Sequence, residues 1–212
     1  MQRVRNIFTN ETSFALDKAI KKYGDYDVTR CIIYRTPVQS FVQKFLGVIT
    51  FGQFQKNIYS NYDNVYHLYV IIEMINKGGQ YAYVLTEKTP NITIEQRRGL
   101  ETGEKNAEGI EVVLPHSVNF KDVVDLAKKE NPQGIQKYSA DKFNCQQYIL
   151  SLINAMYEMN GMKTPNNIFD FIYQDPMKLF KDLPKTAKLA NAITDIAHFA
   201  NRVVGGKEVK RK

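Results

Sequence analysis

The sequence predicts an α+β fold in which a small antiparallel sheet packs against helices. Two runs rich in β-branched and aromatic residues, "VYHLYVIIEM" and "QYAYVLTEK", flank the link "INKGG", a pattern typical of a β-hairpin. In "CQQYILSLINAM" the apolar residues recur at spacings of three and one, which indicates an amphipathic helix. The segment 165–204 also has a helical pattern. With 212 residues, the chain is long enough to bury one core of ordinary size.

The elements before the hairpin are a helix and a strand. Residues 10–23 are predicted to be helical, with Gly24 in the position of a helix-ending glycine. "DVTRCIIYR" is predicted to be a strand, and its Cys31 is interpreted as a buried core residue. Residues 41–54 are unusually apolar. They are either a core helix followed by a loop, or an apolar flap over a site or a lipid surface.

After the hairpin, we expect "IEVVLP" to add a strand to the same sheet. A short amphipathic helix follows in "SVNFKDVVDLAKK", capped by Ser117 or Asn119. Its predicted inner stripe consists of Phe120, Val123, Val124 and Ala127. The best-defined helix begins at Cys145, with Asn144 as its N-cap and Gly161 at its end. The two glycines of "INKGG" are expected to supply positive φ angles to the hairpin turn.

Composition narrows the function classes. The net charge of +7 is spread along the chain, apart from "KEVKRK" at the end, which is either a solvated tail or a polybasic contact to phosphates or lipid headgroups. The aromatic residues do not interleave with a basic stripe, so nucleic-acid binding is disfavoured. The chain has no long apolar run and no apolar leader at its start, so we expect an intracellular or virion protein that is not secreted and has no transmembrane segment. Two cysteines without CxxC spacing predict neither a metal site nor a cofactor.

Cys145 is the residue most suggestive of chemistry. At the first position of a helix, a thiol lies beside backbone N–H groups that carry partial positive charge, and this field favours the thiolate. The same N–H groups can stabilise an oxyanion when a carbonyl is attacked. Alternatively, Cys145 is an ordinary member of the helix's inward stripe.

A cysteine nucleophile needs a base, and the chain offers three histidines: His67, His116 and His198. His116 lies in a predicted loop and His198 on a helix next to an apolar stripe. His67 lies within a strand among Val, Tyr, Leu and Ile, where a polar ring needs a reason. By context His67 is the best candidate for the base, although a hydrogen-bonded core histidine would occupy the same position.

The order of these residues resembles a known group of proteins. His67 in "YDNVYHLYVII", followed by a hairpin and then by Cys145 in "YSADKFNCQQYILSLINA", resembles the circularly permuted NlpC-type papain-like proteins, which include the lecithin:retinol acyltransferase-like enzymes. Over about residues 30–204 the chain is similar to members of this fold encoded by large DNA viruses, virophages and related elements. The resemblance implies a permuted papain-like domain in residues 1–161, a helical extension in 162–204 and a basic flexible tail in 205–212.

The resemblance also implies roles for residues. Cys145 matches the nucleophile and His67 the base. The third polar residue of the family comes from the next strand, where Glu87 is the best match, with Thr86 and Asn91 as alternatives. Many relatives have a histidine or an amide there instead. Asn144 and Gln146 are candidates for substrate binding or the oxyanion site, although residues at a helix start also serve as caps.

Two functions follow as hypotheses. The first is a cysteine hydrolase or acyltransferase that acts on a peptide amide or a lipid ester, with a membrane surface as a possible partner. The second is a minor capsid or virion-associated protein that uses the same fold as a scaffold for capsid proteins. Because one fold supports many functions, the geometry of the site has to decide between them.

Overall fold

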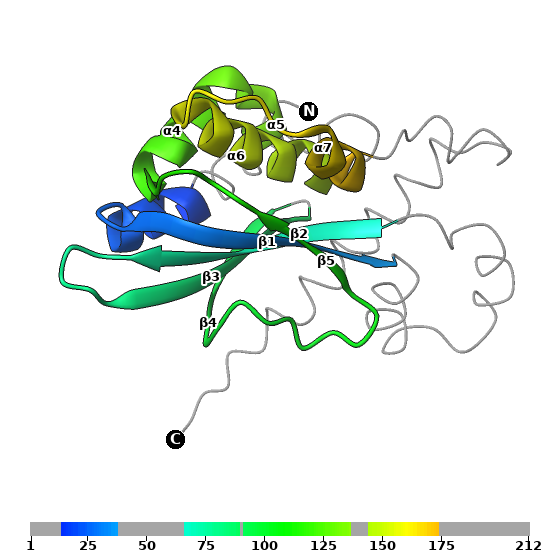
Figure 1. The fold of residues 1–212 in the computed structure, drawn as a ribbon, viewed down its shortest axis with the longest axis horizontal. Helices are drawn as coiled ribbons and strands as arrows, with labels where there is room; N and C mark the ends of the chain where they lie inside the picture. Colours follow the sequence, from blue (N-terminus) through cyan, green and yellow to red (C-terminus); the bar gives the residue numbers. More distant parts are fainter. Residues whose placement is uncertain (1–13, 38–65, 90, 137–143, 174–212) are drawn as a thin grey trace, which may run out of the picture.

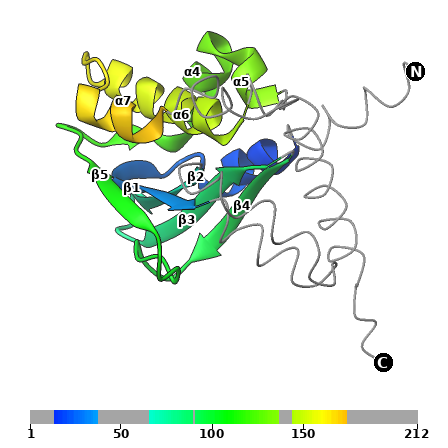
Figure 2. The ribbon, with the colours of Figure 1, turned by 90° about the vertical axis from the view of Figure 1, so that its right-hand side faces the viewer.

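The computed structural model describes residues 14–37, 66–89, 91–136 and 144–173. Residues 14–23 are helical. The strands that follow are β1 (Asp27–Pro37), β2 (Tyr66–Ile75), β3 (Tyr81–Lys88), β4 (Ile92–Arg97), β5 (Glu108–Val112) and β6 (Val118–Asn119). The helices are α4 (Phe120–Glu130), α5 (Pro132–Gln136), α6 (Cys145–Met159) and α7 (Asn166–Ile172). The predicted α+β class is therefore confirmed, and the helices α4 to α7 form a layer on one side of the sheet (Figures 1 and 2).

The sheet is antiparallel, with the strand order β4-β3-β2-β1-β5, and β6 extends it by pairing with β1. The predicted hairpin is β2–β3, and the strand predicted in "IEVVLP" is β5, which pairs with β1. Strand β4 is not predicted from the sequence. This edge strand buries mainly Ile92 and exposes Glu95 and Gln96, so its apolar alternation is weak.

The turn of the β2–β3 hairpin contains one glycine with a positive φ angle. Gly79 has a φ of 77°, whereas Gly78 is not in the positive-φ region, so the expectation that both glycines supply such angles is wrong. The side chain of Asn76 closes the turn without a second positive φ angle. Its Oδ1 accepts hydrogen bonds from the backbone N–H groups of Gly78 and Gln80, at 2.9 Å each, and so holds the loop closed.

The main core lies between the sheet and the helix layer. The predicted stripe of α4 is confirmed, because Phe120, Val123, Val124 and Ala127 are its buried residues. Asn119 rather than Ser117 caps this helix by accepting from the N–H groups of Lys121 and Asp122. Cys31 is fully buried beside Met156, and burial raises the pKa of its thiol to about 12, as expected for an inert core cysteine.

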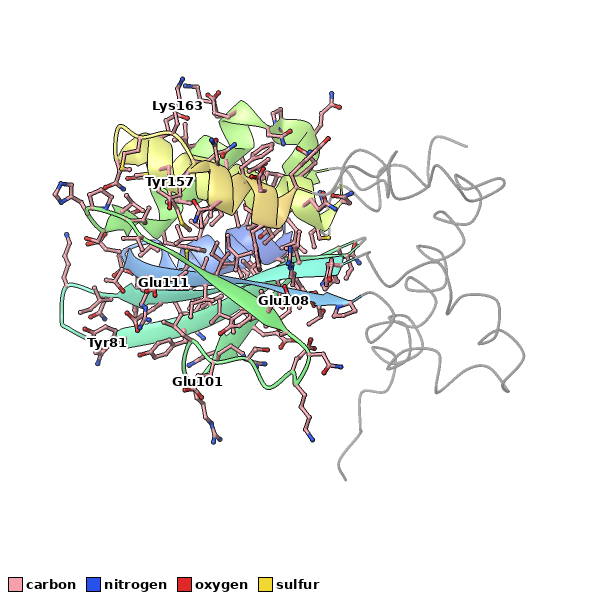
Figure 3. The ribbon with its side chains drawn as sticks, turned by 45° about the vertical axis from the view of Figure 1, so that its right-hand side comes forward. Tyr81, Glu101, Glu108, Glu111, Tyr157 and Lys163 are labelled. Atoms are coloured by element: carbon pink, nitrogen blue, oxygen red, sulfur yellow. The ribbon has the colours of Figure 1, made fainter. Side chains whose placement is uncertain are left out.

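The opposite face of the sheet carries a smaller apolar cluster made by Tyr34, Tyr69 and Ile71. The rings of Tyr34 and Tyr69 stack, and their hydroxyls bond to Leu100 and Thr102 in the loop that follows β4. At the edge of the sheet, Glu108 and Glu111 project from β5 (Figure 3) and form ion pairs with arginines of β1. The loop after β4 therefore covers part of the face that bears no helices.

The chain beyond α6 begins as part of the same core. Gly161, with a φ of 67°, follows the end of α6, and α7 then buries Ile168 and Ile172 in the main cluster. Several predicted segments lie outside the described residues: 174–204 of the predicted helical segment 165–204, the basic tail 205–212, residues 10–13 of the first predicted helix, and the apolar segment 41–54. Among the helices that the structure describes, none is both long enough and apolar enough to cross a membrane.

Candidate active site

His67 is the second residue of β2 and is 8% exposed. On one side, β1 places Thr36 directly opposite it. On the other side, Glu87 of β3 is directly opposite Tyr69, two residues along from His67. Side chains two residues apart on a strand point to the same face, so Glu87 lies diagonally across from His67 and within reach of its ring. The sheet register thus brings an imidazole and a carboxylate together.

Cys145 is the first residue of α6. The Oδ1 of Asn144 accepts hydrogen bonds from the backbone N–H groups of Gln146, at 3.0 Å, and Gln147, at 3.4 Å, and so fixes where the helix begins. β2 and α6 begin at the same end of the molecule (Figure 1). The Cys145 sulfur and the His67 ring therefore belong to two elements that are far apart in sequence and begin at the same end of the molecule.

The side chains of Cys145 and His67 lie close enough for each to shift the pKa of the other through hydrogen bonding and charge. His67 Nε2 lies 2.7 Å from Glu87 Oε2. The sulfur also accepts backbone hydrogen bonds from Leu68 and Gln146. The structure therefore brings together the three residues Cys145, His67 and Glu87, with His67 interacting with both of the others.

The interactions among Cys145, His67 and Glu87 favour the ionised forms of their side chains. Burial alone would lower the pKa of His67 and raise the pKa of Cys145, because it disfavours charge. The hydrogen bonds and charges outweigh burial: Cys145 and Glu87 raise the pKa of His67, and His67 with two backbone donors lowers the pKa of Cys145. Hydrogen bonding to His67 likewise lowers the pKa of Glu87 against the effect of burial. Both shifts favour the pair of a thiolate and an imidazolium over the neutral pair of a thiol and an imidazole.

The alternatives for the third residue point elsewhere. Thr86, next to Glu87, faces the helix layer, and its hydroxyl lies 2.7 Å from the hydroxyl of Tyr148 on α6. Thr86 Oγ1 also donates to the carbonyl of Thr93. Asn91 follows the end of β3, and its side-chain oxygen is buried. Of the three candidates, Glu87 is the one with a described hydrogen bond to His67.

The two other predicted site residues lie at the start of α6. Asn144 acts as the helix cap, with its Oδ1 turned to the helix rather than to an incoming substrate. Gln146 is buried, at 7% exposure, and contributes its backbone N–H to the sulfur. Their roles toward a substrate stay predictions. Of the remaining histidines, His116 is exposed between β5 and β6, away from the site, and His198 lies outside the described residues.

One neighbour of the site was not anticipated. Lys88, the last residue of β3, is 1% exposed and interacts electrostatically with Cys145. In "QYAYVLTEK" every second residue from Ala82 onward is buried, so the alternation places Lys88 on the inward face. That periodicity, read to the end of the strand, could have identified it.

No group of three or more His, Cys, Asp or Glu side chains suited to a metal ion occurs within the described parts of the chain. Comparison with protein-family models, with curated proteins and with solved structures finds no match to this chain.

Proposed function

We propose that this chain is a cysteine hydrolase or acyltransferase that acts on an amide or an ester. The observation that supports it best is the hydrogen-bonded series Cys145–His67–Glu87, which joins a helix-start thiol to a base and an acid. A structural histidine in a sheet needs one polar partner at most. Here the ring interacts with both Cys145 and Glu87, and each of them raises its pKa, which is the arrangement that thiol catalysis requires.

In the first half of the reaction, the Cys145 thiolate attacks the carbonyl carbon of the substrate. A C–S bond forms and the carbonyl π electrons move to the oxygen. The oxyanion lies near the start of α6, where backbone N–H groups and the helix dipole favour negative charge. When the tetrahedral intermediate collapses, the bond to the leaving amine or alkoxide breaks, and the His67 imidazolium supplies the proton that the leaving group needs.

In the second half, neutral His67 removes a proton from water or from another acceptor, which attacks the thioester carbonyl. Collapse of this second intermediate expels the Cys145 thiolate, releases the acid or the transferred acyl product, and restores the imidazolium–thiolate pair. Glu87 holds the ring through Nε2 in both halves and stabilises its positive charge. The proton count balances without any further reactant.

The finer fold assignment belongs to the same proposal. A base on a strand that precedes the nucleophile on a helix is the order of the circularly permuted NlpC-type papain-like group, to which the sequence shows a resemblance. On that basis, we infer a peptide or a lipid acyl group as the substrate and a viral origin for the protein. A scaffold role among capsid proteins is the alternative, and it predicts a cysteine with no unusual reactivity.

Two measurements on the full chain test this function. Iodoacetamide near neutral pH should label Cys145 far faster than Cys31, whose thiol is buried and un-ionised. With p-nitrophenyl acetate, the protein should release a burst of nitrophenol close to one equivalent and gain the mass of one acetyl group on Cys145. The variant Cys31→Ala should retain the burst, whereas Cys145→Ala should lose it.

His67→Ala separates an activated thiol from an accessible one. If His67 maintains the thiolate, its removal should slow alkylation of Cys145 at pH 6 by at least tenfold. Equal alkylation rates in the parent and in His67→Ala, together with no acetyl adduct, would overturn the enzymatic proposal and favour the scaffold.

A further inference from the structure

Lys88 has an unusual position for a lysine. Its side chain is 1% exposed, and Nζ donates a hydrogen bond to the carbonyl oxygen of Ile135 in α5, at 3.1 Å. Fully buried lysines are rare, because taking an ammonium out of water is costly. A buried cation retained at the edge of a reactive site indicates that another group benefits from its charge.

The sheet register places Lys88 beside the backbone that contacts the sulfur. Tyr69 is directly opposite Glu87, so the next positions along the two antiparallel strands are Leu68 on β2 and Lys88 on β3. The backbone of Leu68 donates a hydrogen bond to the Cys145 sulfur. Adjacent residues on a strand point to opposite faces, so Glu87 turns toward His67 while Lys88 turns toward the helix layer that contains Cys145.

On the opposite side of Leu68, β1 places Arg35. This second cation is already committed, because its guanidinium forms an ion pair with Glu108 and stacks on the rings of Tyr66 and Phe171. Glu108 therefore largely compensates the charge of Arg35, which leaves Arg35 little effect on the Cys145 sulfur. Lys88 is the cation of the row whose charge interacts with Cys145.

We propose that Lys88 is a positioning residue of this site, and that its buried ammonium stabilises the Cys145 thiolate from the strand next to His67. The inference rests on the proposed function, because it gives Lys88 a part only where the sulfur is ionised. The two charges act on each other reciprocally: the thiolate favours the charged form of Lys88, so the charged form of Lys88 favours the thiolate.

The groups around Lys88 determine the direction of its titration. Burial lowers its pKa and the Cys145 charge raises it, with a net value of about 7. From α5 it faces the Ile135 carbonyl, and from α6 it faces Cys145, with Tyr148 bonded to the neighbouring Thr86. On β2 and β3, His67 and Glu87 bond to each other. The support that Lys88 gives to the thiolate therefore weakens as pH rises above neutrality.

The test is the pH dependence of Cys145 alkylation by iodoacetamide in the full chain, measured by mass spectrometry between pH 5 and pH 9. Lys88→Met removes the charge and keeps a side chain of similar length, and Lys88→Arg keeps the charge. Lys88→Gln is a second neutral variant in case the Met variant does not fold. Lys77→Met, in the exposed hairpin turn, is the matched control for loss of one positive charge.

We expect Lys88→Met to move the alkylation midpoint up by about 0.5 to 1 pH unit, which slows the reaction at pH 6 about three- to tenfold. Lys88→Arg should regain most of this rate, and Lys77→Met should match the parent. His67 and the backbone groups that stabilise the Cys145 sulfur remain in each Lys88 variant, so the shift of the midpoint should be smaller than that caused by His67→Ala.

A Lys88→Met profile that superimposes on the parent would overturn the inference, as would equal shifts in the Met and Arg variants, which would indicate packing rather than charge. Failure of the proposed function has a different signature. In that case His67→Ala would also leave the alkylation profile unchanged.

Discussion

His67 Nε2 lies 2.7 Å from Glu87 Oε2 across a diagonal of the β2–β3 pair, two residues away from direct opposition. Glu87 is directly opposite Tyr69 on β2, so its carboxylate reaches His67 only along the diagonal. The diagonal contact holds the ring at Nε2, so the hairpin register itself orients the imidazole that interacts with Cys145. The site therefore depends on a sheet pairing that a slip of one residue would destroy.

The first prediction concerns Glu87→Gln. The amide keeps the size of the side chain but removes the charge that raises the pKa of His67, so the imidazolium becomes less stable and the thiolate with it. We expect the midpoint of Cys145 alkylation to rise by about 1 pH unit, and the acylation rate at pH 6 to fall about tenfold. Alkylation profiles measured with iodoacetamide check the shift.

Glu95→Gln, at an exposed position of β4, is the control for loss of one carboxylate from the sheet. It should leave the profile unchanged. Identical behaviour of the two variants would show that Glu87 has no special relation to His67.

The second prediction concerns the pH dependence of stability. The folded His67 has a pKa raised above its ordinary 6.5, and the folded Cys145 has a pKa lowered below its ordinary 9.0. Between about pH 6.5 and 9, the raised pKa of His67 makes the folded state hold more protons and the lowered pKa of Cys145 makes it hold fewer, so the two contributions oppose each other and the net slope is small. Below pH 6.5 the unfolded state binds more protons, and above pH 9 it binds fewer, so the stabilisation declines on both sides.

Urea unfolding of the parent and of His67→Asn/Cys145→Ser, from pH 5 to pH 10, isolates this contribution, because neither substituted side chain titrates in that range. The difference in free energy of unfolding should be flat between about pH 6.5 and 9, with limbs no steeper than about 1.4 kcal/mol per pH unit. A steady rise or fall across that window would mean that the folded pair does not exchange its proton as proposed. Glu87, whose pKa is lowered, would lose its contribution only as pH falls below about 4.5.

Much of the architecture was predictable because its signals are local. The stripe of α4, the hairpin and the cap at Asn144 each follow from spacings within a dozen residues. The choice of His67 over His116 followed from its setting in an apolar strand. Glu87 was predicted as the third residue on the strength of a family resemblance, and the structure gives it a hydrogen bond to His67.

The parts that were missed depend on relations between distant segments. β4 has little apolar alternation of its own and exists as a strand because β3 pairs with it. The second positive-φ glycine of the hairpin was wrong because the Asn76 side chain closes the loop instead. The alternation along β3 places Lys88 on the inward face, but the contact of its ammonium with the Ile135 carbonyl depends on α5, which no spacing within β3 reveals.

The third prediction separates a cap from an oxyanion donor at Asn144. Asn144→Ala should cost about 1 kcal/mol in free energy of unfolding, because two N–H groups at the start of α6 lose their acceptor, while Asn144→Ser should restore most of it. If capping is the whole role, Asn144→Ser should acylate with p-nitrophenyl acetate within about threefold of the parent. A loss of the order of 100-fold in a stable Asn144→Ser protein would instead identify the Asn144 amide as an oxyanion donor.

Asn119→Ala is the matched control, since Asn119 caps α4 in the same manner and has no described contact with the site. It should lose a similar free energy of unfolding with no change in acylation. Urea denaturation and nitrophenol release give the two readouts on the same samples.

The last prediction tests whether Thr86 serves packing rather than catalysis. Its hydroxyl lies 2.7 Å from that of the fully buried Tyr148, so Thr86→Val leaves a buried phenol without this partner and should cost about 1 to 3 kcal/mol in free energy of unfolding. Tyr148→Phe should cost about 1 kcal/mol, and the double variant should cost less than the sum, because the unsatisfied hydroxyl is then gone. Acylation by Thr86→Val should stay near the parent rate, since Glu87 and not Thr86 bonds to His67. Loss of acylation in a Thr86→Val protein of unchanged stability would transfer the third role from Glu87 to Thr86.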